Sequence, residues 1–133
     1  MDHPNAADLM QIPLLAGIPT EFRAELAQRL EVEDHNDGHA IVREGSSGYA
    51  FYLLASGTAV VTQEGHELRR LESGDYFGEI SIMGEGRRTA TVTAVGPVVV
   101  WVLFGTAFRV LQTSRPDVSA AIEAAMQQRL AGH

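Results

Sequence analysis

The sequence predicts a mainly β domain with flanking α-helices, and three observations support this prediction. Between residues 32 and 103, β-prone runs alternate with turns rich in Gly, Asn, Asp and Ser, at spacings of about 8 to 12 residues. Before and after this region, apolar residues recur at helical spacing. With 133 residues and 45% hydrophobic content, the chain is long enough to bury one core. We therefore expect a single domain, residues 1–133, with an all-β sandwich or barrel between helices.

The N-terminal segment, residues 8–30, is predicted to be helical. Phe22, Leu26 and Leu30 are spaced four residues apart, which predicts a helix over Thr20–Leu30. Thr20 stands where its side chain can cap the first turn of that helix. Upstream, two prolines and a glycine interrupt a second group of apolar residues, which indicates a short broken helix or turn that holds the N-terminus against the core.

The β region, residues 31–104, divides into several expected strands. A turn signal bounds each strand: either Gly, which allows positive φ, or Asn and Asp, which form local side-chain hydrogen bonds. The expected strands are Val32–His35, Ala40–Arg43, Ala50–Ala55, Thr58–Thr62, Glu67–Leu71, Thr89–Val95 and Val98–Leu103.

Two helices are expected after the β region, within residues 105–131. The first covers Thr106–Gln112, and the second begins at Pro116, a residue that suits the first helical turn. The second helix carries one apolar stripe at four-residue spacing. The stripe consists of Val118, Ile122, Met126 and Leu130.

Composition and charge exclude several classes of function. The longest apolar run covers residues 98–104, far short of the ~20 residues of a membrane helix, so direct membrane insertion is not expected. The net charge is -7, and the ten basic residues are scattered arginines, so we expect no nucleic acid polymer as a partner. The chain has no cysteine, and its N-terminus does not resemble a signal peptide. A cytoplasmic localisation is therefore expected.

A glycine-rich segment, residues 74–92, interrupts the β pattern and suits an anion. Gly78 allows close approach of the backbone to a ligand. The amides of Ile80 and Ser81 are expected to be unpaired N–H groups at a helix N-terminus. Arg88 can donate two parallel hydrogen bonds to phosphate oxygens. This segment is therefore the candidate binding site of a small phosphate-containing ligand.

Glu79 adds a second requirement, because an ionised carboxylate repels phosphate and can only accept hydrogen bonds. Its presence indicates a hydroxyl donor beside the phosphate, as in a ribose ring. The stretch FGEISIMGEGRRTATV, residues 77–92, resembles the phosphate-binding cassette of the cyclic-nucleotide-binding domain family. That family includes the bacterial catabolite activator, protein kinase A regulatory subunits and cyclic-nucleotide-gated channels. The similarity extends to Arg43-Glu44-Gly45, Phe51-Tyr52-Leu53-Leu54 and Gly74-Asp75, and thus to nearly the whole chain.

The resemblance implies an eight-stranded β-roll of the double-stranded β-helix or jelly-roll type that binds cAMP or cGMP and needs no cofactor or metal. It implies that Glu79 accepts a hydrogen bond from the ribose 2′-hydroxyl, with the Gly78 backbone nearby. The cyclic phosphate would be surrounded by the amides of Ile80 and Ser81, the Arg88 guanidinium, and the hydroxyl and amide of Thr89. The apolar lining of the base pocket would be Val42, Val61, Leu68 and Ala90, with Arg129 over the purine.

One residue departs from the family pattern: Arg87 stands where the family often has Pro. Base choice stays open at this stage, because Thr89 is compatible with both nucleotides, and cAMP is the expected ligand.

The function expected from these residues is a ligand-sensing regulatory domain without catalytic activity. Nucleotide binding would move the two C-terminal helices over the site, with Phe108, Leu111 and Met126 packing against Ile82 and Met83. The effector that this movement controls is not expected within the chain.

Two alternatives are a degenerate β-roll that serves as a structural or protein-interaction module, and a cupin-like metalloenzyme. Intact Glu79, Arg88 and Thr89 argue against the first. Against the second, the sequence has no His-x-His motif, so His35, His39 and His66 are expected to be turn or surface residues.

Overall fold

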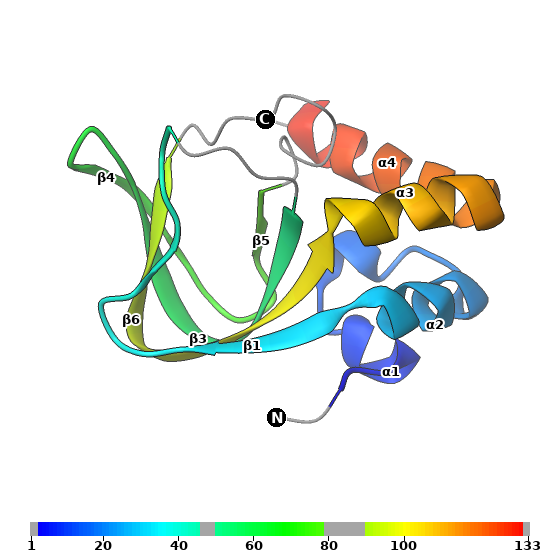
Figure 1. The fold of residues 1–133 in the computed structure, drawn as a ribbon, viewed down its shortest axis with the longest axis horizontal. Helices are drawn as coiled ribbons and strands as arrows, with labels where there is room; N and C mark the ends of the chain where they lie inside the picture. Colours follow the sequence, from blue (N-terminus) through cyan, green and yellow to red (C-terminus); the bar gives the residue numbers. More distant parts are fainter. Residues whose placement is uncertain (1–2, 46–49, 79–89, 132–133) are drawn as a thin grey trace.

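A curled antiparallel sheet of six strands lies beside helices contributed by both ends of the chain (Figure 1). The computed structural model describes residues 3–45, 50–78 and 90–131, the last of these from residue 126 onward by its backbone alone. The N-terminal helices are α1 (Ala6–Leu9), the 3₁₀ helix η1 (Pro13–Leu15) and α2 (Thr20–Arg29).

The N-terminal helices agree with the sequence in position but not in one capping detail. Helix α2 begins at Thr20 as predicted, yet its N-cap is Pro19 and no side chain caps it. The prediction that Thr20 caps the helix is therefore wrong. Thr20 is already helical, and its hydroxyl accepts a hydrogen bond of 3.0 Å from the Arg23 guanidinium instead.

Arg23 is the buried cation that joins the N-terminal helices. Its side chain is 5% exposed, and its guanidinium also donates to the backbone carbonyls of Ala6, Ala16 and Ile18. These partners come from α1, from the turn after η1 and from the residue that precedes the α2 N-cap. A buried charge is tolerated when hydrogen bonds replace its lost hydration, and here four acceptors do so.

All strand pairs in the sheet are antiparallel, and the main path runs β1-β6-β3-β4. The short strand β2 pairs with β6, and β5 pairs with β3. The strands are β1 (Glu31–His35), β2 (Ala40–Val42), β3 (Ala50–Gln63), β4 (His66–Leu71), β5 (Tyr76–Phe77) and β6 (Thr91–Phe104).

Strands β3 and β6 are each continuous where the sequence predicted two shorter strands. Both contain a glycine at positive φ, Gly57 at 97° and Gly96 at 76°. The register between them shifts around Ser56, which marks a bulge at this level. Pairing thus continues through a bend that the sequence alone presents as a turn. When the halves of β3 and β6 are counted separately, the described strands number eight, as expected for the roll.

The two long strands bury side chains on both faces. On one face, Phe51, Leu53, Trp101 and Leu103 pack with the helices. Tyr52, Leu54, Val100 and Val102 alternate with them and point into the roll, where a second apolar cluster forms. Because side chains alternate along a strand, residues adjacent in sequence supply two different cores.

The C-terminal helices, α3 (Gly105–Ser114) and α4 (Pro116–Ala131), complete the helical core, which is the cluster between the helices and the outer face of β3 and β6. Phe108, Leu111, Val118 and Ile122 are all at most 2% exposed within it. Both helices lie inside the region predicted from the sequence, although α3 extends two residues beyond Gln112. Among the described residues, no helix is both long and apolar enough to cross a bilayer.

The bend at Gly57 generates a stability prediction. A Cβ atom at Gly57 would lie 2.6 Å from the carbonyl oxygen of Pro97, whereas one at Gly96 would meet no atom within 4 Å. Both alanine variants carry the positive-φ cost of roughly 1–2 kcal/mol. Gly57→Ala adds an overlap with backbone, which typically costs about 1–3 kcal/mol more. Chemical denaturation should therefore show a clearly larger decrease in the free energy of unfolding for Gly57→Ala than for the matched control Gly96→Ala. Equal losses would contradict this account of the bend.

Candidate functional site

The candidate site lies where the glycine-rich segment meets the inner face of the roll. Five residues predicted to contact ribose and phosphate, namely Glu79, Ile80, Ser81, Arg88 and Thr89, lie outside the described residues, as do Arg87, Ile82 and Met83. The structure places the two ends of this segment and the apolar residues around it.

Both ends of the segment are held by strand β3. At one end, Phe77 pairs with Tyr52 near the start of β3, and their rings stack with centroids 4.8 Å apart. At the other end, Thr91 pairs with Thr62 near the end of β3. Gly78 follows directly after β5 and has φ of 88°, a conformation that favours glycine. The segment thus leaves and re-enters the sheet at two fixed positions of one strand.

Three valines form an apolar floor across neighbouring strands, and we refer to Val42, Val61 and Val92 as the valine floor. In the sheet register Val92 of β6 lies between Val42 of β2 and Val61 of β3. All three side chains are at most 8% exposed and belong to the cluster inside the roll. Ala90 is half-buried and packs against the same cluster.

The valine floor and the adjacent Ala90 bring together three of the four residues predicted to line the base pocket, Val42, Val61 and Ala90. Val92 is not among the lining residues predicted from the sequence. Because side chains two residues apart share a face of a strand, Val92 lies on the inward face with Ala94, and this alternation could have identified it. An apolar floor of this kind suits the flat face of an aromatic base and offers it no hydrogen bond.

Leu68, the fourth predicted lining residue, is at a bulge. Val61 pairs with Arg69, and Thr62 pairs with Glu67, so Leu68 is the extra residue on β4 and has no partner of its own. A bulge redirects the side chain that it carries. Leu68 is 56% exposed and does not belong to the cluster inside the roll, so its contact with the base stays a prediction.

Glu44 holds the surrounding loops in place. Its backbone amide donates to the Thr91 hydroxyl at 3.0 Å. Its carboxylate oxygens accept from the Glu64 amide at 3.0 and 3.3 Å, in the β3–β4 turn where Glu64 has φ of 52°. The sequence marks this position only as part of a matching motif. Its geometric role is to connect the end of β2, the β3–β4 turn and the start of β6.

Arg129, predicted to lie over the purine, belongs to α4, for which this part of the structure gives the backbone only. The same limit applies to Met126. Helix α4 runs back along α3 toward the sheet, so its C-terminal end is nearer to the roll than its first turn (Figure 1). The proposed contacts of both side chains remain predictions.

The junction between α3 and α4 is tied to α2 by Arg115. Its guanidinium contacts carboxylate oxygens of Asp117 at 3.2 Å, Glu21 at 3.3 Å and Glu25 at 3.8 Å. The same group lies 6.0 Å from the ring centroid of Phe22. The hydrogen bond from Arg115 is the main reason that the pKa of Asp117 is lowered from its usual 3.8. Arg115 thus connects the N-terminal helices to the hinge between the C-terminal ones.

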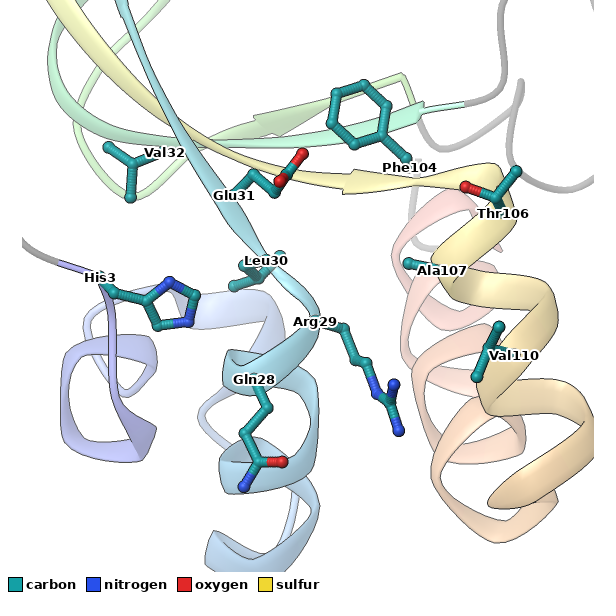
Figure 2. Close-up of a pocket in the computed structure, with 10 residues that line it drawn as sticks. All are labelled: His3, Gln28, Arg29, Leu30, Glu31, Val32, Phe104, Thr106, Ala107 and Val110. Atoms are coloured by element: carbon teal, nitrogen blue, oxygen red, sulfur yellow. The ribbon is translucent and has the colours of Figure 1, made fainter.

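A separate surface pocket lies between the end of α2, the start of β1 and α3 (Figure 2). Arg29 extends into it from α2 and is paired with Glu25 at 3.2 Å. Of the predicted ligand-site residues that the structure describes in full, namely Val42, Val61, Leu68, Gly78 and Ala90, none lines this pocket. Its lining is His3, Gln28, Arg29, Leu30, Glu31, Val32, Phe104, Thr106, Ala107 and Val110.

Known proteins share both the sequence pattern and the fold of this chain. Residues 32–114 match the family model described as "Cyclic nucleotide-binding domain". The cGMP-dependent protein kinase, isozyme 1, of Drosophila melanogaster is 40% identical over 98 residues, 68% of this chain and 13% of that protein. The cAMP-dependent protein kinase regulatory subunit of Debaryomyces hansenii is 34% identical over 111 residues, 83% of this chain and 25% of that protein.

A solved structure extends the likeness to the whole fold. The regulatory domain of Toxoplasma gondii PKA, crystallised with cAMP, superposes with a TM-score of 0.81 at 28% identity. The superposition covers 96% of this chain and 49% of the other. The chain spans less than a third of the length of the curated relatives that it matches. With a matching family model over more than half of its residues, the chain belongs to the cyclic nucleotide-binding domain family.

Proposed function

We propose that this domain binds cAMP or cGMP inside the roll, with cAMP preferred, and acts as a regulatory module without catalytic activity. One observation carries the proposal. The valine floor lies directly beside Thr91, one of the two anchored ends of a segment whose sequence contains both a ribose partner and a phosphate partner. An apolar surface, a hydroxyl acceptor and a phosphate donor are the three chemistries that a cyclic nucleotide presents.

The phosphate and the sugar are recognised by the segment between Gly78 and Ala90. Arg88 supplies the charge, the amides of Ile80 and Ser81 supply N–H donors, and Glu79 accepts from the 2′-hydroxyl. The net charge of -7 does not prevent this, because hydrogen bonds from one arginine and a few amides act at short range while distant charges are screened.

The base lies against the valine floor and the exposed Leu68. Binding would remove water from an apolar side chain that is 56% exposed in this structure, which favours association. The relatives include a cGMP-dependent and a cAMP-dependent protein, so the choice of base depends on polar contacts in this chain. Thr89 is the residue proposed to distinguish them.

Ligand binding is coupled to α3 and α4, the elements that follow β6 directly. Ligand can shift these helices only by its differential affinity for the two arrangements. Phe108 and Leu111 anchor α3 in the helical core, and Arg115 fixes the hinge to α2. A shift of α4 would therefore strain or break the contacts of Arg115. The effector lies outside this chain, and the cytoplasmic localisation stays a prediction.

The first test removes the phosphate partner. Loss of one partner of a buried charge pair typically costs roughly 2 to 5 kcal/mol. Arg88→Ala should therefore weaken cAMP binding by about 30-fold to several thousand-fold in calorimetry. Glu79→Gln should lose less, because a neutral amide oxygen still accepts from the hydroxyl. Arg87→Ala is the matched control and should bind nearly as the wild type does. Unchanged affinity in Arg88→Ala would overturn the site assignment and favour the alternative of a structural or interaction module.

The second test concerns the choice of base. In Thr89→Ala the hydroxyl that can meet the guanine amino group is gone, whereas the backbone amide toward the phosphate remains. We expect cGMP affinity to fall by about tenfold, the value of one hydrogen bond, while cAMP affinity falls less. Parallel calorimetric titrations with both nucleotides measure this. Equal losses of affinity for the two nucleotides would mean that the Thr89 hydroxyl contacts the phosphate and does not distinguish the bases.

The third test concerns the hinge. Because Arg115 lowers the folded-state pKa of Asp117, their contact stabilises the fold at neutral pH, and this contribution is lost as the pH falls through the lowered pKa. Carboxyl NMR titration should find the Asp117 midpoint below 3.8 in the wild type and closer to 3.8 in Arg115→Gln. Glu123→Gln, a change elsewhere on α4, should leave the midpoint unchanged. Identical midpoints in wild type and Arg115→Gln would contradict the contact between Arg115 and Asp117.

A further inference from the structure

Three titratable side chains meet at the turn between β1 and β2, away from the nucleotide site. The Nδ1 atoms of His35 and His39 are 2.7 Å apart. On the far side of the His35 ring, Nε2 lies 3.0 Å from a carboxylate oxygen of Glu33. His39 is exposed to solvent, whereas the His35 side chain is only 11% exposed.

The two imidazole rings meet edge to edge. Their planes differ by 16°, and their centroids are 4.9 Å apart. The centroid separation nearly equals the Nδ1–Nδ1 distance of 2.7 Å plus the distance from each centroid to its own Nδ1 atom. The two centroids and the two Nδ1 atoms therefore lie close to one line. Because the ring planes are also nearly parallel, the rings are nearly coplanar and their Nδ1 atoms point at each other. The Nδ1 lone pair of an imidazole lies in the ring plane. The contact therefore requires a shared proton, with one nitrogen donating and the other accepting.

Glu33 assigns the roles of the two nitrogens of His35. An ionised carboxylate only accepts, so Nε2 of His35 donates to Glu33, and Nδ1 of the neutral ring carries the lone pair. A carboxylate that fixes one ring nitrogen and leaves the other as a ligand is the usual arrangement behind metal-binding histidines.

We propose that His35 and His39 bind one divalent transition-metal ion through their Nδ1 atoms, with Glu33 orienting His35. The ion takes the place of the shared proton, and the neutral His39 ring then carries its one N–H on Nε2. Metal–nitrogen distances of about 2.0–2.1 Å at a tetrahedral angle place the two nitrogens roughly 3.3 Å apart. The two nitrogens therefore need to separate by a few tenths of an ångström, and each ring needs to turn by roughly 35° so that its lone pair points at the ion. Imidazole ligands suit Cu²⁺, Ni²⁺ and Zn²⁺.

The backbone around the pair is already held in position. The Gly38 amide donates to the Ala94 carbonyl at 2.8 Å, and the Ala94 amide donates to the His39 carbonyl at 2.9 Å. Opposite β1, strand β6 presents Val98, Val99 and Val100, which carry no charge. The carboxylate of Asp37 is occupied by the Gly96 amide at 2.7 Å. Glu33 is thus the carboxylate directed at the pair.

The number of protein ligands limits the strength of the site. Within the described ranges no group of three or more His, Cys, Asp or Glu side chains is arranged to hold a metal ion. The protein supplies two nitrogens, and water completes the coordination sphere. We therefore expect weaker binding than in four-ligand structural zinc sites. An occupied site would link His35, the last residue of β1, to His39, which precedes β2.

The experiment is a calorimetric titration of the full chain with Zn²⁺ in a non-chelating buffer without nucleotide. One site is expected in the wild type, with at least tenfold weaker binding in His39→Ala. The matched control is His66→Ala, an exposed histidine at the start of β4, which should bind as the wild type does. Glu33→Gln should bind about 10–100-fold more weakly, because the carboxylate behind His35 is lost.

A spectroscopic readout identifies the ligating atoms. Imidazole ¹⁵N NMR with Zn²⁺ should shift the Nδ1 resonances of both His35 and His39. The absence of saturable Zn²⁺ binding, or equal affinity in wild type and His39→Ala, would overturn the proposal. Because the titration contains no nucleotide and the variants leave residues 77–92 intact, its outcome is independent of cyclic-nucleotide binding.

Discussion

The antiparallel pairing of β3 with β6 is the constraint on which the rest of the structure depends. Their register extends from Ala50 opposite Phe104 to Thr62 opposite Thr91, through the bend at Gly57 and Gly96. At Gly57 the partner strand approaches so closely that a side chain has no room. This pairing gives the sheet two buried faces. One face supports the helices, and the other becomes the interior of the roll.

The site follows from the same pairing. Because Val61 and Val92 are register partners, the valine floor is set by the sheet and does not depend on a loop. Because Phe77 and Thr91 both pair with β3, the segment that carries Glu79 and Arg88 has its two ends fixed on a rigid element. Helix α3 begins immediately after β6, so the same strand links the pocket to the helices proposed to move.

Local patterns predicted much of the fold, and most of the failures depend on contacts between distant segments. Apolar spacing placed α2, α3 and α4 close to their observed bounds, since helical periodicity is visible within a short window. A glycine at positive φ can belong either to a turn that ends a strand or to a bend within a continuous strand. For Gly57 and Gly96 only the strand pairing, which the local sequence does not reveal, distinguishes the bend from the turn. Thr20 is a residue type that often caps helices, yet its hydroxyl accepts a hydrogen bond from the buried Arg23 side chain instead. No spacing rule predicts a bond of that kind.

The candidate site shows the same division. Motif spacing gave Gly78 and the expected ribose and phosphate partners, and the family resemblance gave Val42 and Val61 as lining residues. The bulge that exposes Leu68, and the contact of Glu44 with the β3–β4 turn, depend on register between distant segments. The pairing of His35 with His39 also escaped the sequence, which presented them as separate turn residues.

The central claim is that the roll binds a cyclic nucleotide, and a calorimetric titration of the unmodified chain with cAMP, cGMP and 5′-AMP tests it most directly. The account predicts one site per chain for cAMP, weaker binding of cGMP, and at least tenfold weaker binding of 5′-AMP, whose phosphate is not cyclised onto the ribose. Bound ligand should also raise the melting temperature by mass action. Absence of binding by both cAMP and cGMP at millimolar concentration would contradict the account.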